Sequence, residues 1–214
     1  MKFFTDKCCL PPPTLERLAR LYTLLGRLEE AQTRRVTSRA LEGLLSVPCH
    51  TIRKDISLLG AAAKAERGYD VAALRQTLGL RLGLSAGYSV CLVGLGRLGG
   101  AILNQAGADR RYPLAAAFDA SMNRIELTRT DVPLYHSTQI SRVVREKAIT
   151  AGIITVPPHA AWEAAERLIA GGARGIVNFS PVIITAADKP VVVRNISLTG
   201  ELDVIAAYIH MQGV

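Results

Sequence analysis

One short stretch, residues 88–101, constrains the fold of this chain more than any other. An apolar, β-branched run ends at Gly94-Leu-Gly96-Arg-Leu-Gly99 and resumes as a helical pattern at Ala101. Gly94 permits a tight turn, Gly96 lets the backbone approach a pyrophosphate, and Gly99 lets the helix pack close to the strand. The first turn of that helix would offer free N–H groups and a partial positive charge to phosphates. The alternative is a glycine turn that only packs a helix on a sheet.

The second half of the same signal lies twenty residues past the last of these glycines. Residues 114–118 form another apolar run, which ends in Asp119. An acid at this place bonds the ribose hydroxyls of NAD and repels the 2′-phosphate of NADP. The strand, the glycine loop, the helix and the acidic strand end together predict a Rossmann fold that prefers NAD(H).

Strand and helix patterns alternate beyond Asp119. In chain order they are a helix over 137–147, a strand over 149–156, a helix over 160–170, and strands over 175–178 and 191–193. This alternation predicts a parallel, doubly wound sheet, which binds ligands at the carboxyl ends of its strands. Residues 155–159 would lie there beside the pyrophosphate and the nicotinamide ribose, and residues 178–181 beside the nicotinamide. Each of these two loops, taken alone, is also compatible with ordinary loop chemistry.

The first eighty residues carry a different pattern, that of a small helical domain. Apolar spacing predicts helices over 14–28, with Thr14 as N-cap, and from Thr37-Ser38, with a tight turn at 46–48. A third helix over 49–59 would bury Ile52, Ile56 and Leu59. Two short helices joined by a tight turn are typical of a helix-turn-helix. A linking helix that carries the apolar residues Val71, Leu74, Leu78 and Leu80 then leads into the strand at Ser89.

Charge points to the partner of this first segment. Its residues 1–80 hold 13 Lys and Arg against 8 Asp and Glu, more than half of the net charge of +8 of the chain. Such an excess favours a polyanion, although a solvated arginine-rich surface gives the same count. Polar side chains of the third helix that face away from its apolar stripe would contact bases or phosphates: His50, Thr51, Arg53, Lys54 and Ser57. Residues 61–69 would form a wing, with Lys64 and Arg67 placed to touch the DNA backbone or minor groove.

Several classes of protein are disfavoured by the composition. No apolar run approaches the roughly 20 residues of a membrane helix, and the first residues lack the apolar core of a signal peptide. The four cysteines, Cys8, Cys9, Cys49 and Cys91, form no CxxC pair and no metal-binding spacing. We therefore expect a cytoplasmic protein with reduced thiols, no membrane partner and no metal site.

Over almost its full length, the sequence resembles the Rex family of redox-sensing transcriptional repressors. The motifs that carry the resemblance are, in chain order, Thr51-Ile-Arg53-Lys54-Asp55-Ile-Ser57, Arg67-Gly68-Tyr69-Asp70-Val71, Gly94-Leu-Gly96-Arg-Leu-Gly99, Ala117-Phe118-Asp119, Val156-Pro157 and Asn178-Phe179-Ser180-Pro181. The resemblance implies an α/β protein with a winged helix-turn-helix DNA-binding domain (1–84), a Rossmann NAD(H)-binding domain (85–196) and a C-terminal helix (197–214) swapped in a homodimer. It also implies a repressor without enzymatic activity that binds palindromic operator DNA, leaves it when NADH binds, and is returned to it by competing NAD+.

The resemblance also assigns residues to each ligand. The cofactor-binding residues would be Gly94, Leu95, Gly96, Arg97, Leu98, Gly99, Asp119 and Ala120 on the adenosine side, and Thr155, Val156, Pro157, Asn178, Phe179, Ser180 and Pro181 on the nicotinamide side. The DNA-binding residues would be Arg39, His50, Thr51, Arg53, Lys54 and Ser57, with Lys64 and Arg67 on the wing. The chain departs from the family pattern at Gln105 and Ser197, where the family carries an aromatic residue and an acid that couple nicotinamide binding to domain movement.

Two other readings stay open at this point. An NAD-dependent dehydrogenase with a basic helical appendage would need a general acid or base near the nicotinamide. Of the four histidines, His50, His136, His159 and His210, only His159 follows a loop expected at the site, and no Tyr-x-x-x-Lys pair is present. The third reading is a nucleotide- or CoA-binding module that has lost DNA binding.

Overall fold

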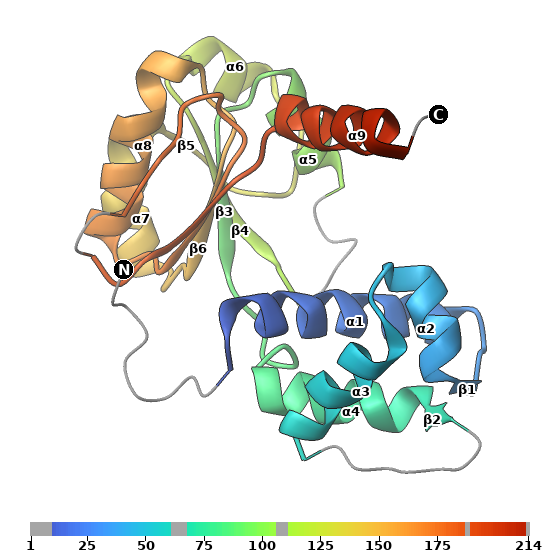
Figure 1. Cartoon of the computed structure of the whole chain (residues 1–214). Coiled ribbons are helices and arrows are strands. Elements are labelled where there is room, and N and C mark those ends of the chain that lie inside the picture. The colour runs from blue at the N-terminus through green and yellow to red at the C-terminus, as the bar shows by residue number, and fades with distance from the viewer. Residues whose placement is uncertain (1–9, 61–67, 106–110, 187–188, 213–214) are drawn as a thin grey trace. The chain divides into compact units, whose positions relative to one another are not determined.

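Two units, Met1–Ala86 and Gly87–Val214, make up the chain (Figure 1). The computed structural model describes residues 10–60, 68–105, 111–186 and 189–212. The predicted wing residues Lys64 and Arg67, and the thiols of Cys8 and Cys9, lie outside these described residues.

The first unit is built from four helices and one small two-stranded sheet in its described part. Its elements are α1 (Pro12–Glu30), β1 (Arg35–Val36), α2 (Ser38–Leu45), α3 (Cys49–Leu58), β2 (Tyr69–Asp70) and α4 (Val71–Leu82). The apolar faces of the helices meet in one core that includes Leu18, Leu25, Leu41, Ile56 and Leu78. The predicted burial of Ile52, Ile56 and Leu59 on α3 is confirmed.

Some local predictions for this unit were wrong. Helix α1 begins at Pro12 rather than after Thr14, because proline needs no N–H partner in a first helical turn. Thr14 is therefore inside the helix, where its hydroxyl accepts a hydrogen bond from Arg17. Leu80, one of the apolar residues of the linking helix, is 70% exposed, since it lies on the solvent side of α4. Arg35, between the first two helices, lies in β1, which pairs antiparallel with β2.

The second unit contains a six-stranded sheet whose strands are all parallel. Its elements are β3 (Val90–Val93), α5 (Arg97–Asn104), β4 (Leu114–Asp119), α6 (Met122–Leu127), β5 (Leu134–His136), a 3-10 turn η1 (Ser137–Gln139), α7 (Ile140–Glu146), β6 (Ala151–Ile154), α8 (Pro158–Gly171), β7 (Gly175–Asn178), β8 (Val192–Asn195) and α9 (Leu198–Gln212). In the strand order β5-β4-β3-β6-β7-β8, the direction of the order reverses between β3, which leads into the glycine loop, and β6. The predicted doubly wound Rossmann sheet is confirmed.

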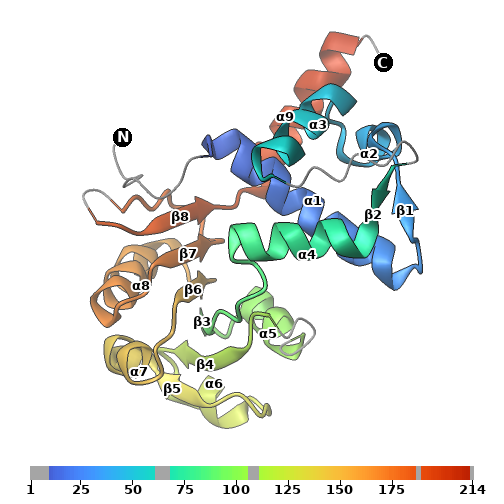
Figure 2. The ribbon, with the colours of Figure 1, turned by 90° about the horizontal axis from the view of Figure 1, so that it is seen from below.

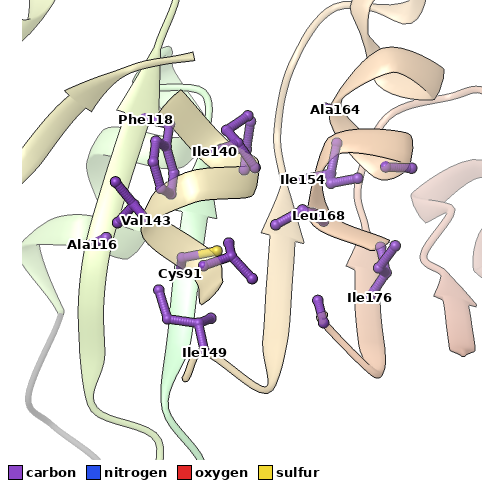
Figure 3. Packing of buried hydrophobic residues seen from close by; sticks show 14 of the residues in the cluster. Cys91, Ala116, Phe118, Ile140, Val143, Ile149, Ile154, Ala164, Leu168 and Ile176 are labelled. Carbon is purple, nitrogen blue, oxygen red and sulfur yellow. The ribbon is translucent and has the colours of Figure 1, made fainter. Parts of the chain in front are cut away.

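Helices cover both faces of this sheet. In Figures 1 and 2, α7 and α8 lie on one face, and α5 and α6 lie on the other. Alternate residues of the strands serve the two faces, since Cys91 packs with the α7 and α8 cluster (Figure 3) whereas Leu92 packs with the α5 side. Burial raises the pKa of the Cys91 thiol to about 12, because the thiolate loses its hydration there.

The helix α6 and the strand β5 were not predicted, because each is too short to show a periodic apolar pattern. Helix α9 confirms the expected C-terminal helix, although none of its described residues is buried. Within the described part of the chain, every helix is too short or too polar to cross a membrane.

Candidate functional site

The glycine loop joins β3 to α5, and two of its glycines are required by the fold itself. Gly94 has a φ of +105°, and a Cβ there would lie 2.9 Å from the Thr155 carbonyl oxygen. A Cβ on Gly99 would lie only 1.8 Å from the Gly94 carbonyl oxygen. The Thr155 hydroxyl ties the two loops together by donating to the Gly94 carbonyl at 2.8 Å. Larger side chains at these two positions would separate the helix from the sheet.

Gly96 differs from both of these glycines. Among the described residues, no atom lies within 4 Å of the position that a Cβ on Gly96 would occupy. Gly96 also lines a cavity of the second unit. The space that a side chain would fill here is open to a ligand, as a pyrophosphate approaching the backbone requires.

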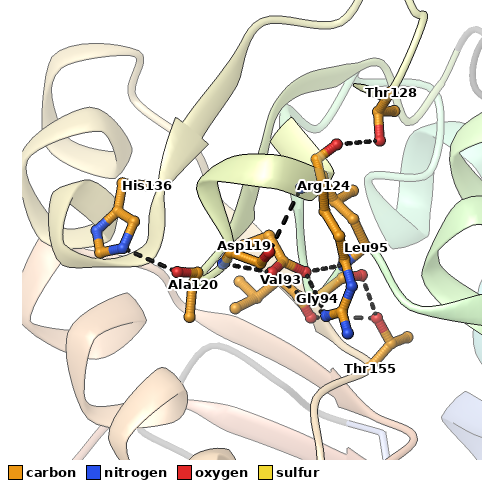
Figure 4. Close-up of polar contacts among 10 residues, drawn as sticks. Val93, Gly94, Leu95, Asp119, Ala120, Arg124, Thr128, His136 and Thr155 are labelled. Carbon is orange, nitrogen blue, oxygen red and sulfur yellow. Dashed lines mark hydrogen bonds and ion pairs between the residues drawn. The ribbon is translucent and has the colours of Figure 1, made fainter. Parts of the chain in front are cut away.

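Asp119 ends β4 with its side chain held in place by the backbone around it. The carboxylate is 5% exposed, and it accepts hydrogen bonds from the Leu95 N–H at 2.7 Å and the Ser121 N–H at 2.8 Å. The Arg124 guanidinium reaches back from α6 to within 3.4 Å of both carboxylate oxygens (Figure 4). The acid thus connects the glycine loop of β3 to the loop after β4.

A cavity of about 610 Å³ opens where β3, β4 and β6 end. Eight of the predicted cofactor-binding residues line it: Gly94, Gly96, Asp119, Ala120, Thr155, Val156, Pro157 and Pro181. Parallel strands bring their carboxyl ends to one edge, which explains why residues from positions 94 to 181 meet there. The volume falls within the usual range for small-molecule pockets.

The other predicted cofactor-binding residues lie around this cavity rather than on its described lining. On the loop and helix of the glycine motif, Leu95 and Gly99 are buried, whereas Arg97 and Leu98 are exposed. Phe179 is about one-third exposed, beyond the end of β7.

Asn178 and Ser180 are both buried in the loop after β7. The Asn178 amide donates to the Val182 carbonyl at 2.7 Å, and its side-chain oxygen accepts from the Ser180 N–H at 2.9 Å. Asn178 therefore holds the shape of the loop that carries Pro181. The Ser180 hydroxyl has no hydrogen-bond partner among the described residues.

Sequence reasoning missed part of the cavity wall. Four lining residues after β4 and β5 were not predicted, namely Ser121, Arg124, Ser137 and Ile140. On α8 the cavity is lined by His159, which was expected there as the end of the loop at 155–159, and by the unpredicted Glu163 and Arg167, so that this wall consists of His159, Glu163 and Arg167. The four-residue spacing of the last three places them on one face of a helix that starts at the carboxyl edge, which was the available signal. His136 is adjacent, and its ring contacts the Ala120 carbonyl at 3.1 Å (Figure 4). No group of three or more His, Cys, Asp or Glu side chains that could hold a metal occurs among the described residues.

The first unit presents the predicted DNA-contacting residues on α2 and α3. His50, Arg53, Lys54 and Ser57 are exposed along α3, Thr51 is half-buried, and Arg39 is exposed on α2. The Thr37 side chain caps α2 by accepting from the Ala40 N–H at 3.1 Å. A left-handed Ser46 then ends α2, so that the chain turns into α3 within three residues. Helix, short turn and polar helix match the docking geometry of a helix-turn-helix.

One ion pair that fixes α3 was not predicted. Arg17 on α1 donates to both carboxylate oxygens of Asp55, at 2.6 and 2.9 Å, and Asp55 is 4% exposed. The hydrogen bond to Asp55 raises the pKa of Arg17. Arg53 and Lys54 immediately precede Asp55, so this pair sets the rotation at which α3 presents them.

Two family models match the chain: "Putative DNA-binding protein N-terminus" over residues 9–57 and "CoA binding domain" over residues 86–182. A redox-sensing transcriptional repressor Rex of Levilactobacillus brevis is 35% identical over 202 residues, covering 94% of this chain and 95% of the relative. The repressor of the same name from Leuconostoc citreum is 33% identical over 210 residues, covering 98% and 97%.

Solved structures give the same result. The crystal structure of RSP, a Rex-family repressor, aligns with a TM-score of 0.82 and 26% identity over 97% of this chain and 98% of that chain. The complex of RSP with β-NAD+ and operator DNA aligns at 0.83, with 26% identity over 97% and 95% of the two chains. The complex with β-NADH aligns at 0.81, with 26% identity over 97% of both.

Proposed function

Because the chain belongs to the Rex family of redox-sensing transcriptional repressors, we propose that it is a DNA-binding repressor whose hold on its operator depends on NADH and NAD+. The first unit would bind the duplex, and the second would bind the dinucleotide. Both relatives described above are named as repressors rather than as enzymes.

Gly96 is the observation that carries the dinucleotide half of this proposal. Gly94 and Gly99 are needed for packing, but the described protein atoms leave the space next to Gly96 free. At Gly96 the absence of a side chain is not needed for packing and leaves space only in the cavity. This is best explained by a ligand that approaches the backbone.

The residues present fit NAD(H). Gly94 and Gly96 would hold the pyrophosphate, Asp119 the ribose hydroxyls of the adenosine half, and Thr155 to Pro157 with Pro181 the nicotinamide half. The cofactor supplies two redox states that differ by one hydride and by the charge of the nicotinamide ring. To respond to the redox state, the protein then needs only to bind NADH and NAD+ with different affinities in its DNA-binding and released conformations.

Operator binding would use the exposed side chains of α3, with Arg53 and Lys54 directed at base edges and phosphates. Arg39 would add a contact from α2, and Lys64 and Arg67 contacts from the predicted wing. We assign the domains as 1–84, 85–196 and 197–214, and a cytoplasmic location where operator DNA and the NADH pool are both accessible.

A homodimer completes the proposal, because palindromic operators have two equivalent half-sites. Helix α9 carries two exposed apolar stripes, Leu198, Leu202, Ile205 and Ile209 on one side and Val204, Tyr208 and Met211 on another. A helix that is apolar on two sides is suited to lie between two surfaces rather than on one. We propose that these surfaces belong to the second subunit.

The test is a pair of linked titrations. A labelled palindromic duplex from the region upstream of this protein's own gene is titrated with the protein alone, with NAD+ and with NADH. NADH should weaken operator binding, and the operator should weaken NADH binding by the same factor, because coupling between two ligands is reciprocal. If the protein binds the operator in a salt-dependent manner but saturating NADH leaves that affinity unchanged, the result contradicts the proposed sensing.

A further inference from the structure

The feature that the proposed function leaves unexplained is the arginine beside the ribose-binding acid. Two arginines line the cavity in the described part of the second unit, Arg124 and Arg167. Arg167 is engaged, since it donates to Glu163 at 2.6 Å and to the Ser137 carbonyl at 3.2 Å. Arg124 has a different environment, because its guanidinium contacts only Asp119 among the side chains that the structure describes.

Asp119 does not depend on Arg124 for its position. Both of its oxygens already accept backbone N–H groups at 2.7 and 2.8 Å, from Leu95 and Ser121. The contacts from Arg124 are longer, at 3.4 Å, and its side chain is 58% exposed. An ion pair that is long and exposed to water contributes little to folding. The guanidinium is therefore loosely held at the corner of the cavity where the adenosine ribose would bind.

We propose that Arg124 is a second determinant of cofactor choice, positioned to bind a 2′-phosphate, and that the charge of Asp119 keeps the site selective for NAD(H). This inference rests on the proposed NAD(H) site. A carboxylate at the end of β4 accepts hydrogen bonds from the ribose hydroxyls and repels a 2′-phosphate, whereas a nearby arginine accommodates that phosphate. Here both groups are present and contact each other. Removing the negative charge would leave a free guanidinium, whose planar donors match a phosphate.

The experiment compares NAD+ and NADP+ binding to the complete chain by calorimetry. The variants are Asp119→Asn, Arg124→Gln and the double variant. Asp119→Asn should strengthen NADP+ binding about tenfold, which is the value of one charge-assisted hydrogen bond. Adding Arg124→Gln should abolish that gain. Arg124→Gln alone should not strengthen NADP+ binding, because Asp119 keeps its charge and still repels the 2′-phosphate.

Arg142 is the matched control. Its side chain is also 58% exposed and pairs with Glu146 at 3.0 Å, but it lies on α7 and does not line the cavity. Arg142→Gln in the Asp119→Asn background should keep the gain in NADP+ affinity. Should Asp119→Asn fail to fold, as judged by its melting temperature, Asp119→Ser replaces it, since serine keeps one hydrogen-bond acceptor.

Three results would overturn the inference. The first is equal NADP+ affinity of the Asp119 variant with and without Arg124. The second is no NADP+ binding by the folded Asp119 variant, and the third is a gain in NADP+ affinity in Arg124→Gln alone. A wild-type protein that binds neither NAD+ nor NADH would instead remove the proposed function. The two failures are therefore distinguishable in one set of titrations.

Discussion

At the scale of single residues, the three glycines of the loop separate folding from binding. Gly96→Ala should leave thermal stability nearly unchanged, because the described structure has no atom near the new methyl group. The same methyl should weaken NADH binding about tenfold or more by obstructing the pyrophosphate. NADH titration by fluorescence, with a thermal melt of each variant, measures both effects.

Gly100 offers the matched control, since a Cβ there also meets no described atom within 4 Å and it does not line the cavity. Gly100→Ala lies inside α5, so we expect about 0.5–1 kcal/mol of added stability and normal NADH binding. Gly99→Ala should fail to fold, because its methyl would overlap the Gly94 carbonyl. Equal NADH affinity of Gly96→Ala and Gly100→Ala would refute the role given to Gly96.

A second residue, Cys91, gives a pH dependence. Its pKa rises from 9.0 to about 12 on burial, so the unfolded chain releases the thiol proton first as the pH rises. The native state binds more protons above pH 9, and stability is therefore lost between about pH 9 and pH 12. From pH 7.5 to pH 10 the loss from this one group is about 1.4 kcal/mol.

Urea unfolding at the two pH values measures this loss. Cys91→Val should remove about 1.4 kcal/mol of the pH dependence, whereas Cys49→Ser, at the half-exposed thiol of α3, should retain it. A Cys91→Val protein with the wild-type pH dependence would show that other groups cause it.

At the scale of elements, α3 depends on one buried ion pair for its orientation. The Asp55 side chain is buried, but the side chain of Arg17 is 30% exposed, which screens the interaction. A double-mutant cycle of Arg17→Ala and Asp55→Ala should therefore give a coupling of about 2 kcal/mol, below the value for a fully buried pair. Operator affinity should fall in both single variants, because Arg53 and Lys54 lose their fixed orientation.

The pair Arg142 and Glu146 is the reference for this cycle, since both side chains are more than half exposed on one helix. Its coupling should not exceed about 0.5 kcal/mol. Similar couplings for the two pairs would show that Asp55 does not anchor α3.

The helices and strands also show how much of the structure could be predicted from the sequence. The long apolar patterns predicted α1, α3, β3, β4 and α8, because burial of one face leaves a periodic trace in the sequence. The short elements α6 and β5 left no such trace, and they supply Arg124, His136 and their neighbours. The cavity was therefore predicted at its glycine loop, at Asp119 and at the loops that carry Thr155 to Pro157 and Pro181, but not at the residues that α6 and the segment after β5 contribute. The Arg17 and Asp55 pair joins residues 38 positions apart, and a single sequence does not show such a pairing.

At the scale of the whole molecule, the sequence departures at Gln105 and Ser197 can now be described. Gln105 follows the last residue of α5, and the Ser197 hydroxyl accepts from the Gly200 N–H at 3.0 Å at the start of α9. Ser197 thus caps the helix that we propose to join the subunits. An acid would cap equally well, so capping alone does not explain why serine stands here.

We propose that helix α9 joins two copies of the chain. None of its described residues is buried, so deleting residues 198–214 removes no part of the described core. The deletion should convert a dimer into a monomer, as measured by light scattering. It should also weaken operator binding at least about a hundredfold, because two linked recognition helices bind a palindrome far more tightly than one.

Point variants separate this effect from general damage. Ile205→Asp places a charge on an apolar stripe and should dissociate the dimer, whereas Asp203→Asn, on the polar side of the same helix, should leave it intact. Both variants keep the sheet and the cavity, so each should still bind NAD+. A dimer that survives both the deletion and Ile205→Asp would place the subunit interface elsewhere. A monomer with wild-type operator affinity would instead show that DNA binding does not require the dimer. In that case the proposed release of both half-sites by NADH would not act through dimerisation.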